Sequence, residues 1–126
     1  MIKPPTLLGD TVDRLTILEL KLELISDQTK ILSVKQERAL ISFALDQYLH
    51  ESGIDRDEVL RIKEQLYITN KNAWAEIDTH IALINICDMV ALGNSAYKMF
   101  RLNQRRVNLK NLINRLDGDI EEVKSY

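Results

Sequence analysis

The residues best suited to chemistry lie in and around the segment FRLNQRRVNLKNLINR, Phe100–Arg115, which carries five cations and no acid. On a helical wheel these cations fall on both sides of an apolar stripe and not on one exposed face. The stripe consists of Leu102, Leu109, Ile113 and Leu116. One flank carries Lys98, Arg101 and Arg105, and the other carries a polar row of Asn103, Arg106, Lys110 and Asn114. Cations in these positions could bind phosphate, dock on a partner, pair with a buried acid, or extend along the rim of a core.

Two polar residues elsewhere occupy apolar helix faces. Asp13 falls on the same face as Ile17, and Asn70 falls within the apolar stripe of another helix. A buried carboxylate or amide is unfavourable unless it is paired. The sequence offers Arg106 and Lys110 as the partners. We therefore expect Arg106 to face inward and to pair with Asp13.

Two interpretations of this polar group are open at the level of sequence. In the first, Asp13 and Arg106 form a buried ion pair that fixes the register between helices. In the second, a small polar pocket beside Trp74 binds a ligand, with Asp78 as a further carboxylate. The candidate binding residues are Asp13, Asn70, Trp74, Asp78, Asn103, Arg106, Lys110 and Asn114. No catalytic residue is predicted among them.

Other reactive side chains lack the spacing of a metal or catalytic site. His50 and His80 have no second ligand at HxxxH or HxxE spacing, so neither is expected to bind a metal. Cys87 has no neighbouring base and is predicted to be a small apolar core residue. Four acids could hold magnesium as in helical nucleotide pyrophosphatases: Glu19 and Glu23, or Glu76 and Asp78. They depart from the Glu-Glu-x-x-Glu and Glu-x-x-Asp pattern of those enzymes, and the chain has no glycine-rich phosphate loop, so no metal or cofactor is expected.

The elements that position these residues are predicted to be four α-helices. The chain has only 4 glycines and 2 prolines, and no alternating β-branched runs that would favour strands. The predicted helices are Gly9–Ile25, Thr29–His50, a third from a cap at Asp55 to Leu92, and a fourth from a cap at Ser95 to Leu116. Short connections favour antiparallel neighbours, which predicts an all-α, up-down helical bundle dominated by a long third helix.

The predicted boundaries rest on caps and turn residues. Ser26 and Asp27 favour a turn or a new cap after the first helix, and Gly53 favours the end of the second. Asp55 and Glu58 have the spacing of a capping box, and Gly93–Asn94 is expected to end the third helix. The whole chain, residues 1–126, is expected to form one helical domain with an entry segment at residues 1–8. Residues 117–126 are expected to be a short tail that begins with a turn.

The third helix carries the clearest apolar pattern. Its members fall in one stripe: Val59, Leu60, Ile62, Leu66, Tyr67, Ala73, Trp74, Ile77, Ile81 and Ile84. Several of them repeat every seven residues, which is typical of a helix that packs along a neighbouring helix.

The first helix has two apolar faces. One carries Ile17, Leu20 and Leu24, and the other carries Leu15, Leu18, Leu22 and Ile25. A helix that is apolar on two sides needs two packing partners. One partner can be the rest of the chain and the other a second subunit, so we expect a homodimer formed through the first helix.

Composition narrows the class of protein. The chain has 126 residues, of which 45% are hydrophobic and 29% charged, as in a globular domain. Its apolar runs are too short for a membrane span, residues 1–8 lack the features of a signal peptide, and a single cysteine fits a reducing cytoplasm. The net charge of −2 and the split arrangement of the cations argue against a nucleic-acid partner.

Three stretches together resemble one protein family. Gly9–Lys21 is similar to its Gly-Glu-hydrophobic-hydrophobic-Asp-Lys-Ile-Thr-Ile-Leu-Glu-Ile-Lys opening, and Asn70 with Trp74 to its Asn-x-x-x-Trp helix. The third stretch comprises Asn103, Arg106, Lys110, Ile113, Asn114, Glu121, Glu122 and the ending Lys124–Ser125–Tyr126. The family is a bacterial domain of unknown function, and the resemblance implies an association with surface-sugar genes but no activity. Glu76–Ile77 reverses the family's order and Val123 interrupts its Glu-Glu-Lys-Ser-Tyr ending, which leaves any role of Glu76 and the geometry of the tail unsupported.

Two classes of function are therefore expected. The first is a non-catalytic helical interaction or accessory module, linked through the resemblance to surface-sugar metabolism. It is favoured because helix faces are abundant and catalytic spacing is missing. The alternative is a small all-α ligand-binding protein or enzyme that acts on a phosphorylated or sugar-nucleotide compound. A fully packed core around Trp74 would favour the first class. A solvent-connected cleft lined by Arg106 and Lys110 would favour the second.

Overall fold

Four helices account for most of residues 7–118, which are the residues that the computed structural model describes. They are α1 (Leu8–Leu24), α2 (Gln28–Ser52), α3 (Arg56–Ile86) and α4 (Met89–Leu116). No strand occurs within residues 7–118, and α3 is the longest helix of this part of the chain, with 31 residues. The predicted all-α fold of four helices with a long third helix is confirmed. The predicted tail from residue 119 onward lies outside the described residues.

Aspartates cap the N-termini of α2, α3 and α4, and the first two of these caps were predicted. The side chain of Asp27 accepts a hydrogen bond from the backbone N–H of Thr29, and the side chain of Asp55 accepts one from Glu58. Both are side-chain N-caps, which satisfy backbone donors that a helix start leaves without a partner. The carboxylate of Glu58 binds Arg61. Gly53 ends α2 at a φ of 72°, a conformation that glycine adopts without steric cost.

The prediction for the turn between α3 and α4 is wrong. The turn lies at Cys87–Asp88 and not at Gly93–Asn94, because Asp88 caps α4 through the backbone N–H of Ala91 at 3.0 Å. Cys87 takes the left-handed conformation at a φ of 54° and is exposed, so it is not the core residue that the sequence suggested. Ser95, the predicted cap, instead donates a hydrogen bond to Glu76 across the hairpin at 2.7 Å.

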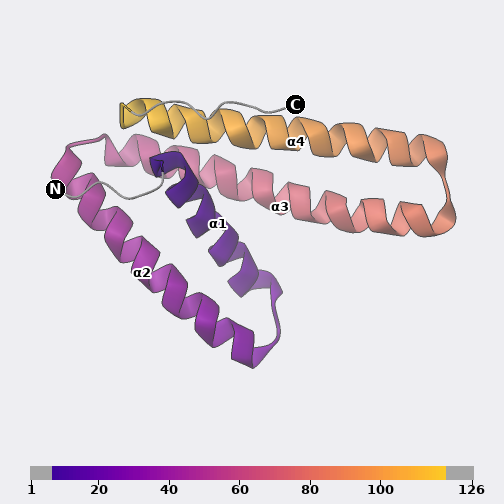
Figure 1. Cartoon of the computed structure of the whole chain (residues 1–126), viewed down its shortest axis with the longest axis horizontal. Helices are drawn as coiled ribbons and strands as arrows, with labels where there is room; N and C mark the ends of the chain where they lie inside the picture. Colours follow the sequence, from indigo (N-terminus) through magenta and orange to yellow (C-terminus); the bar gives the residue numbers. More distant parts are fainter. Residues whose placement is uncertain (1–6, 119–126) are drawn as a thin grey trace.

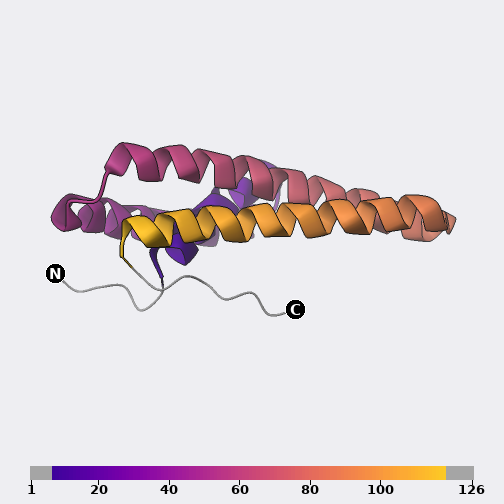
Figure 2. The same cartoon turned by 90° about the horizontal axis from the view of Figure 1, so that it is seen from above.

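The helices form two hairpins. Figure 1 shows α1 and α2 antiparallel at one end of the longer α3–α4 hairpin and inclined to it. α1 contacts all three other helices, whereas α2 packs mainly on α1. Figures 1 and 2 both show the far end of the α3–α4 hairpin projecting beyond α1 and α2. This inclination means that α1 covers only one part of the hairpin.

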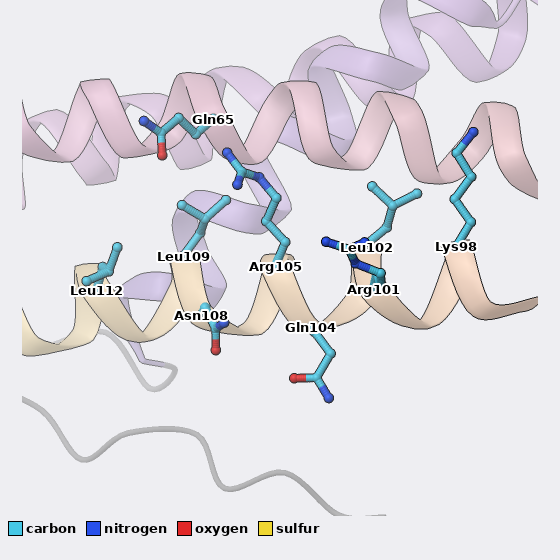
Figure 3. A pocket seen from close by; sticks show the side chains of 9 residues that line it. All are labelled: Gln65, Lys98, Arg101, Leu102, Gln104, Arg105, Asn108, Leu109 and Leu112. Atoms are coloured by element: carbon cyan, nitrogen blue, oxygen red, sulfur yellow. The ribbon is translucent and has the colours of Figure 1, made fainter.

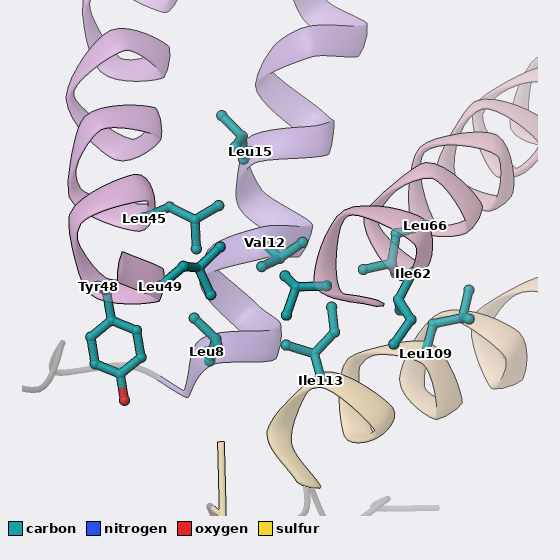
Figure 4. Close-up of a cluster of buried hydrophobic side chains, with 11 residues drawn as sticks. Leu8, Val12, Leu15, Leu45, Tyr48, Leu49, Ile62, Leu66, Leu109 and Ile113 are labelled. Atoms are coloured by element: carbon teal, nitrogen blue, oxygen red, sulfur yellow. The ribbon is translucent and has the colours of Figure 1, made fainter. Parts of the chain in front are cut away.

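The core lies where the two hairpins meet (Figure 4). It contains Leu8, Val12 and Leu15 of α1, Leu45, Tyr48 and Leu49 of α2, Val59, Ile62 and Leu66 of α3, and Leu109 and Ile113 of α4. Burial of such side chains is the main favourable contribution to folding. No helix within residues 7–118 combines the length and apolar composition that a membrane crossing requires.

Both apolar faces of α1 have partners inside the chain. Leu20, on the first face, and Leu15 and Leu18, on the second, are all buried. Leu15 packs in the same cluster as Leu45 of α2, so the second face meets α2. The part of the second face formed by Leu15 and Leu18, on which a dimer through the first helix was expected, is therefore covered within the single chain, and Leu22 and Ile25 are half-buried.

Candidate functional site

The centre of the candidate site is Asp13 of α1, whose carboxylate accepts hydrogen bonds from side chains of α3 and α4. Arg106 of α4 donates to both carboxylate oxygens of Asp13, with its Nε at 3.0 and 3.2 Å and an Nη at 2.5 Å. Asn70 of α3 donates its amide to Asp13 Oδ1 at 2.9 Å and to the hydroxyl of Thr16 at 2.9 Å. Thr16 in turn donates to the backbone carbonyl of Asp13 at 2.7 Å. The predicted pair of Arg106 and Asp13 is confirmed.

Burial makes this network a link between helices. Asp13 is only 4% exposed and Asn70 only 3%, whereas the side chain of Arg106 remains 35% exposed. A two-point contact between guanidinium and carboxylate is among the strongest side-chain hydrogen bonds and tolerates little misalignment. Both oxygens of Asp13 are engaged by side chains of the same molecule. The arrangement therefore fixes α1 against α3 and α4.

A small cavity adjoins the network on the side away from the core. It has a volume of about 220 Å³ and four of the predicted residues line it: Asn70, Trp74, Asn103 and Arg106. The remaining lining is apolar: Ile17, Ala73, Ile77, Met99 and Leu102. Asp13 lies behind Arg106 and is not part of this lining. The cavity thus has a polar end formed by Arg106 and a larger apolar part.

Two predicted residues form a separate contact at the start of α1. Lys110 pairs with Asp10 at 3.0 Å, and the buried side chain of Asn114 accepts the backbone N–H of Gly9 at 2.7 Å. Leu7, at the N-cap position, makes no side-chain cap, so Asn114 of α4 satisfies this donor from another helix. A Cβ on Gly9 would lie 2.3 Å from the carbonyl oxygen of Lys110. Glycine is therefore required at position 9 for α1 to approach α4 this closely.

Asp78 lies outside the buried network, and of the other predicted residues only Trp74 shares its pocket among residues 7–118. It lines a second pocket of about 430 Å³ with Leu24, Lys71, Trp74, Ala75 and Ile77. At its edge, Lys71 pairs with Glu23 at 2.8 Å, and the hydroxyl of Tyr67 donates to the same carboxylate. The hydrogen bonds from Lys71 and then Tyr67 hold the pKa of Glu23 below its usual value, and the bond to Glu23 raises the pKa of Lys71. Both groups stay charged at neutral pH.

Several residues of these contacts were not predicted as site residues. Thr16 lies three residues after Asp13, on an adjacent part of the helix surface, and this spacing could have indicated its contact with Asp13. Gly9 and Asp10 open the stretch that resembles a protein family, but their contacts with α4 depend on how closely that helix approaches. Glu76 is buried and accepts from Ser95, and only the three-dimensional position of α4 reveals that pair.

The described residues contain no group of three or more His, Cys, Asp or Glu side chains placed to hold a metal ion. Comparison of the chain with models of protein families, with curated proteins and with solved structures found no match. The assignment of a function therefore rests on the geometry of the chain itself.

Proposed function

We propose that this protein is a non-catalytic helical interaction module that pairs with a second copy of itself. The pairing surface is the part of the α3–α4 hairpin that α1 leaves uncovered. The observation that carries the proposal is a change along the apolar stripe of α3: Val59, Ile62 and Leu66 are buried, whereas the later members Ile77, Ile81 and Ile84 are exposed. Ile77, Ile81 and Ile84 follow at spacings of four and three, so they continue one helix face.

The size of this surface suits a dimer. We define the distal face as Trp74, Ile77, Ile81, Ile84 and Met99 of this hairpin, together with Leu24 at the adjacent end of α1. Leu24 and the three isoleucines are 42–54% exposed. With half-buried Trp74 and Met99, they offer on the order of 500 Å² of apolar area. A standard interface takes about 800 Å² from each partner, a little over half of it apolar. A patch of about 500 Å² is in the range of the largest apolar patch on a monomer, and such patches often mark a contact site.

The charges at the edge of the distal face fit a two-fold arrangement. Lys71 lies three residues before Trp74 and Asp78 lies four residues after it, on the same side of α3. When two copies pair about a two-fold axis, a lysine and an aspartate at the edge of the same patch can each meet the opposite charge of the other copy. Such self-complementary interfaces are the commonest in homo-oligomers, and rim charges favour the matching orientation.

The buried network supports the non-catalytic part of the proposal. Reactive carboxylates generally have a perturbed environment in a cleft that a substrate can reach. Asp13 is instead enclosed and bound by Arg106 and Asn70, as expected of a group that orients helices.

The oligomeric state in solution tests this function. Light scattering coupled to gel filtration should give twice the 14.6 kDa of one chain. Ile81→Glu with Ile84→Glu should give the monomer mass with an unchanged far-UV circular dichroism spectrum, because both side chains are exposed and contribute little to the fold of one chain.

Leu40→Glu provides the matched control. Leu40 is also a large exposed aliphatic residue, at 72%, but it lies on the outer side of α2. The control should remain dimeric. A monomeric parent chain, or a dimer that Leu40→Glu dissociates while the double variant does not, would show that the distal face is not the interface between copies.

A further inference from the structure

A second surface, on the flank of α4 opposite to Arg106 and Lys110, forms a basic groove between α3 and α4. The groove has a volume of about 750 Å³ and is lined by Gln65, Lys98, Arg101, Leu102, Gln104, Arg105, Asn108, Leu109 and Leu112. Three of these residues are cations and none is an acid. Figure 3 shows Lys98 and Arg105 extending from α4 toward α3, with Leu102 between them and Leu109 beyond Arg105. This groove lies outside the buried network and the distal face.

The cations of the groove are weakly engaged by the protein. Lys98 is 70% exposed and its ammonium lies 3.5 Å from Glu76, a carboxylate that also accepts from Ser95. Within the described part of the chain, Arg105 donates only to the neutral hydroxyl of Thr69, at a long 3.3 Å. Arg101 makes no hydrogen bond or ion pair with any residue in the described range 7–118. By contrast, Arg106 and Lys110 on the opposite flank pair with acids of α1.

The spacing of these cations matches a ligand with more than one anionic group. Lys98, Arg101 and Arg105 lie within two turns of α4, and their backbones span about 10 Å along the helix. Long side chains from this span can converge on adjacent phosphates, and guanidinium groups bind phosphate oxygens in pairs. The leucines offer an apolar floor and the amides of Gln65 and Asn108 offer hydrogen bonds to the rest of a small molecule.

Nucleic acid fits the groove less well. No aromatic side chain of residues 7–118 lines it, so this part of the chain offers bases no stacking surface, and the net charge of −2 provides little long-range attraction for a polyanion. We propose that the groove between α3 and α4 binds a small compound that carries two or more phosphate groups, held by Lys98, Arg101 and Arg105.

Calorimetric titration of the full chain with inorganic pyrophosphate at physiological salt tests the proposal. Pyrophosphate should bind, and orthophosphate should bind more weakly because it engages fewer cations. Arg101→Gln with Arg105→Gln should weaken pyrophosphate binding by about tenfold or more. Amide shifts in nuclear magnetic resonance spectra should map to residues 98–112 of α4.

The control is Arg38→Gln, an exposed arginine of α2 away from the groove, which should bind pyrophosphate like the parent. The double variant should keep the parent's circular dichroism spectrum. Absence of pyrophosphate binding by the parent overturns the proposal, and so does an equal loss of binding in Arg38→Gln. Tighter binding of a single-stranded oligonucleotide than of pyrophosphate would assign the groove to nucleic acid instead. None of these outcomes depends on whether the chain dimerises through its distal face.

Discussion

At the scale of single residues, Asp13 and Arg106 differ in their contact with water, and this difference determines the cost of separating them. Arg106→Ala leaves a carboxylate that is only 4% exposed without its cation. A fully buried pair would lose roughly 3–5 kcal/mol, but the 35% exposure of Arg106 lets water reach the site. We expect the free energy of unfolding to fall by about 2–3 kcal/mol in urea denaturation. Arg14→Ala, which breaks the exposed pair with Glu37, should cost under about 1 kcal/mol.

The double variant Asp13→Leu with Arg106→Leu should recover much of this loss, because it removes both charges and fills the site with apolar groups. If Arg106→Ala unfolds at the same urea concentration as the parent, the pair does not fix α1 against α4. If the double variant is less stable than Arg106→Ala, the charged network itself contributes net stability.

Gly9 provides a second prediction at this scale. Gly9→Ala places a Cβ 2.3 Å from the carbonyl oxygen of Lys110 and 2.8 Å from the side-chain oxygen of Asn114. The start of α1 must then move away from α4, with partial loss of the hydrogen bond to Asn114. We expect a loss of about 2 kcal/mol or more in the free energy of unfolding. An alanine variant as stable as the parent would show that α1 and α4 do not approach each other this closely.

At the scale of the helices, Gly93 tests where the turn between α3 and α4 lies, because the sequence suggested a turn at Gly93 and the structure places it within α4. A glycine that ends a helix has a positive φ and tolerates alanine poorly. Gly93 instead lies within α4, with open space around the position of a Cβ. Gly93→Ala should therefore raise the free energy of unfolding by about 0.5–1 kcal/mol. A decrease in the free energy of unfolding would instead support a turn at Gly93–Asn94.

Asp88→Ala tests whether Asp88 caps the start of α4. It removes the side-chain cap of α4 and should lower the free energy of unfolding by about 1 kcal/mol. Asp88→Asn keeps a capping side chain and should stay within a few tenths of a kcal/mol of the parent. Thermal or urea unfolding of the three variants gives the comparison directly.

At the scale of the whole molecule, dimerisation through the distal face couples stability to concentration. A partner that binds only the folded chain raises its apparent stability by mass action. The midpoint of thermal unfolding should therefore rise with protein concentration for the parent. For Ile81→Glu with Ile84→Glu it should stay constant. A parent midpoint that does not depend on concentration would count against the pairing, whatever the mass at a single concentration.

Helix content, most helix boundaries and the pairing of Asp13 with Arg106 were predictable from the sequence. These features depend on local signals: apolar periodicity, capping aspartates, and a charge that falls on an apolar face. Asp27 and Asp55 cap the helices whose starts they suggested, and Asp13 and Arg106 each lie on the face that the wheel assigned. The turn at Cys87–Asp88 was missed, because Gly93 is a stronger breaker in isolation than the aspartate that caps α4.

Only the tertiary structure decided which apolar faces are covered. The stripe from Val59 to Ile84 is continuous in sequence, yet Val59, Ile62 and Leu66 are buried where the hairpins meet, and Ile77, Ile81 and Ile84 are exposed. The second face of α1, which suggested a subunit contact, is covered by α2 of the same chain. Periodicity reports which residues share a face of a helix, whereas the neighbour of that face depends on the length and inclination of other helices.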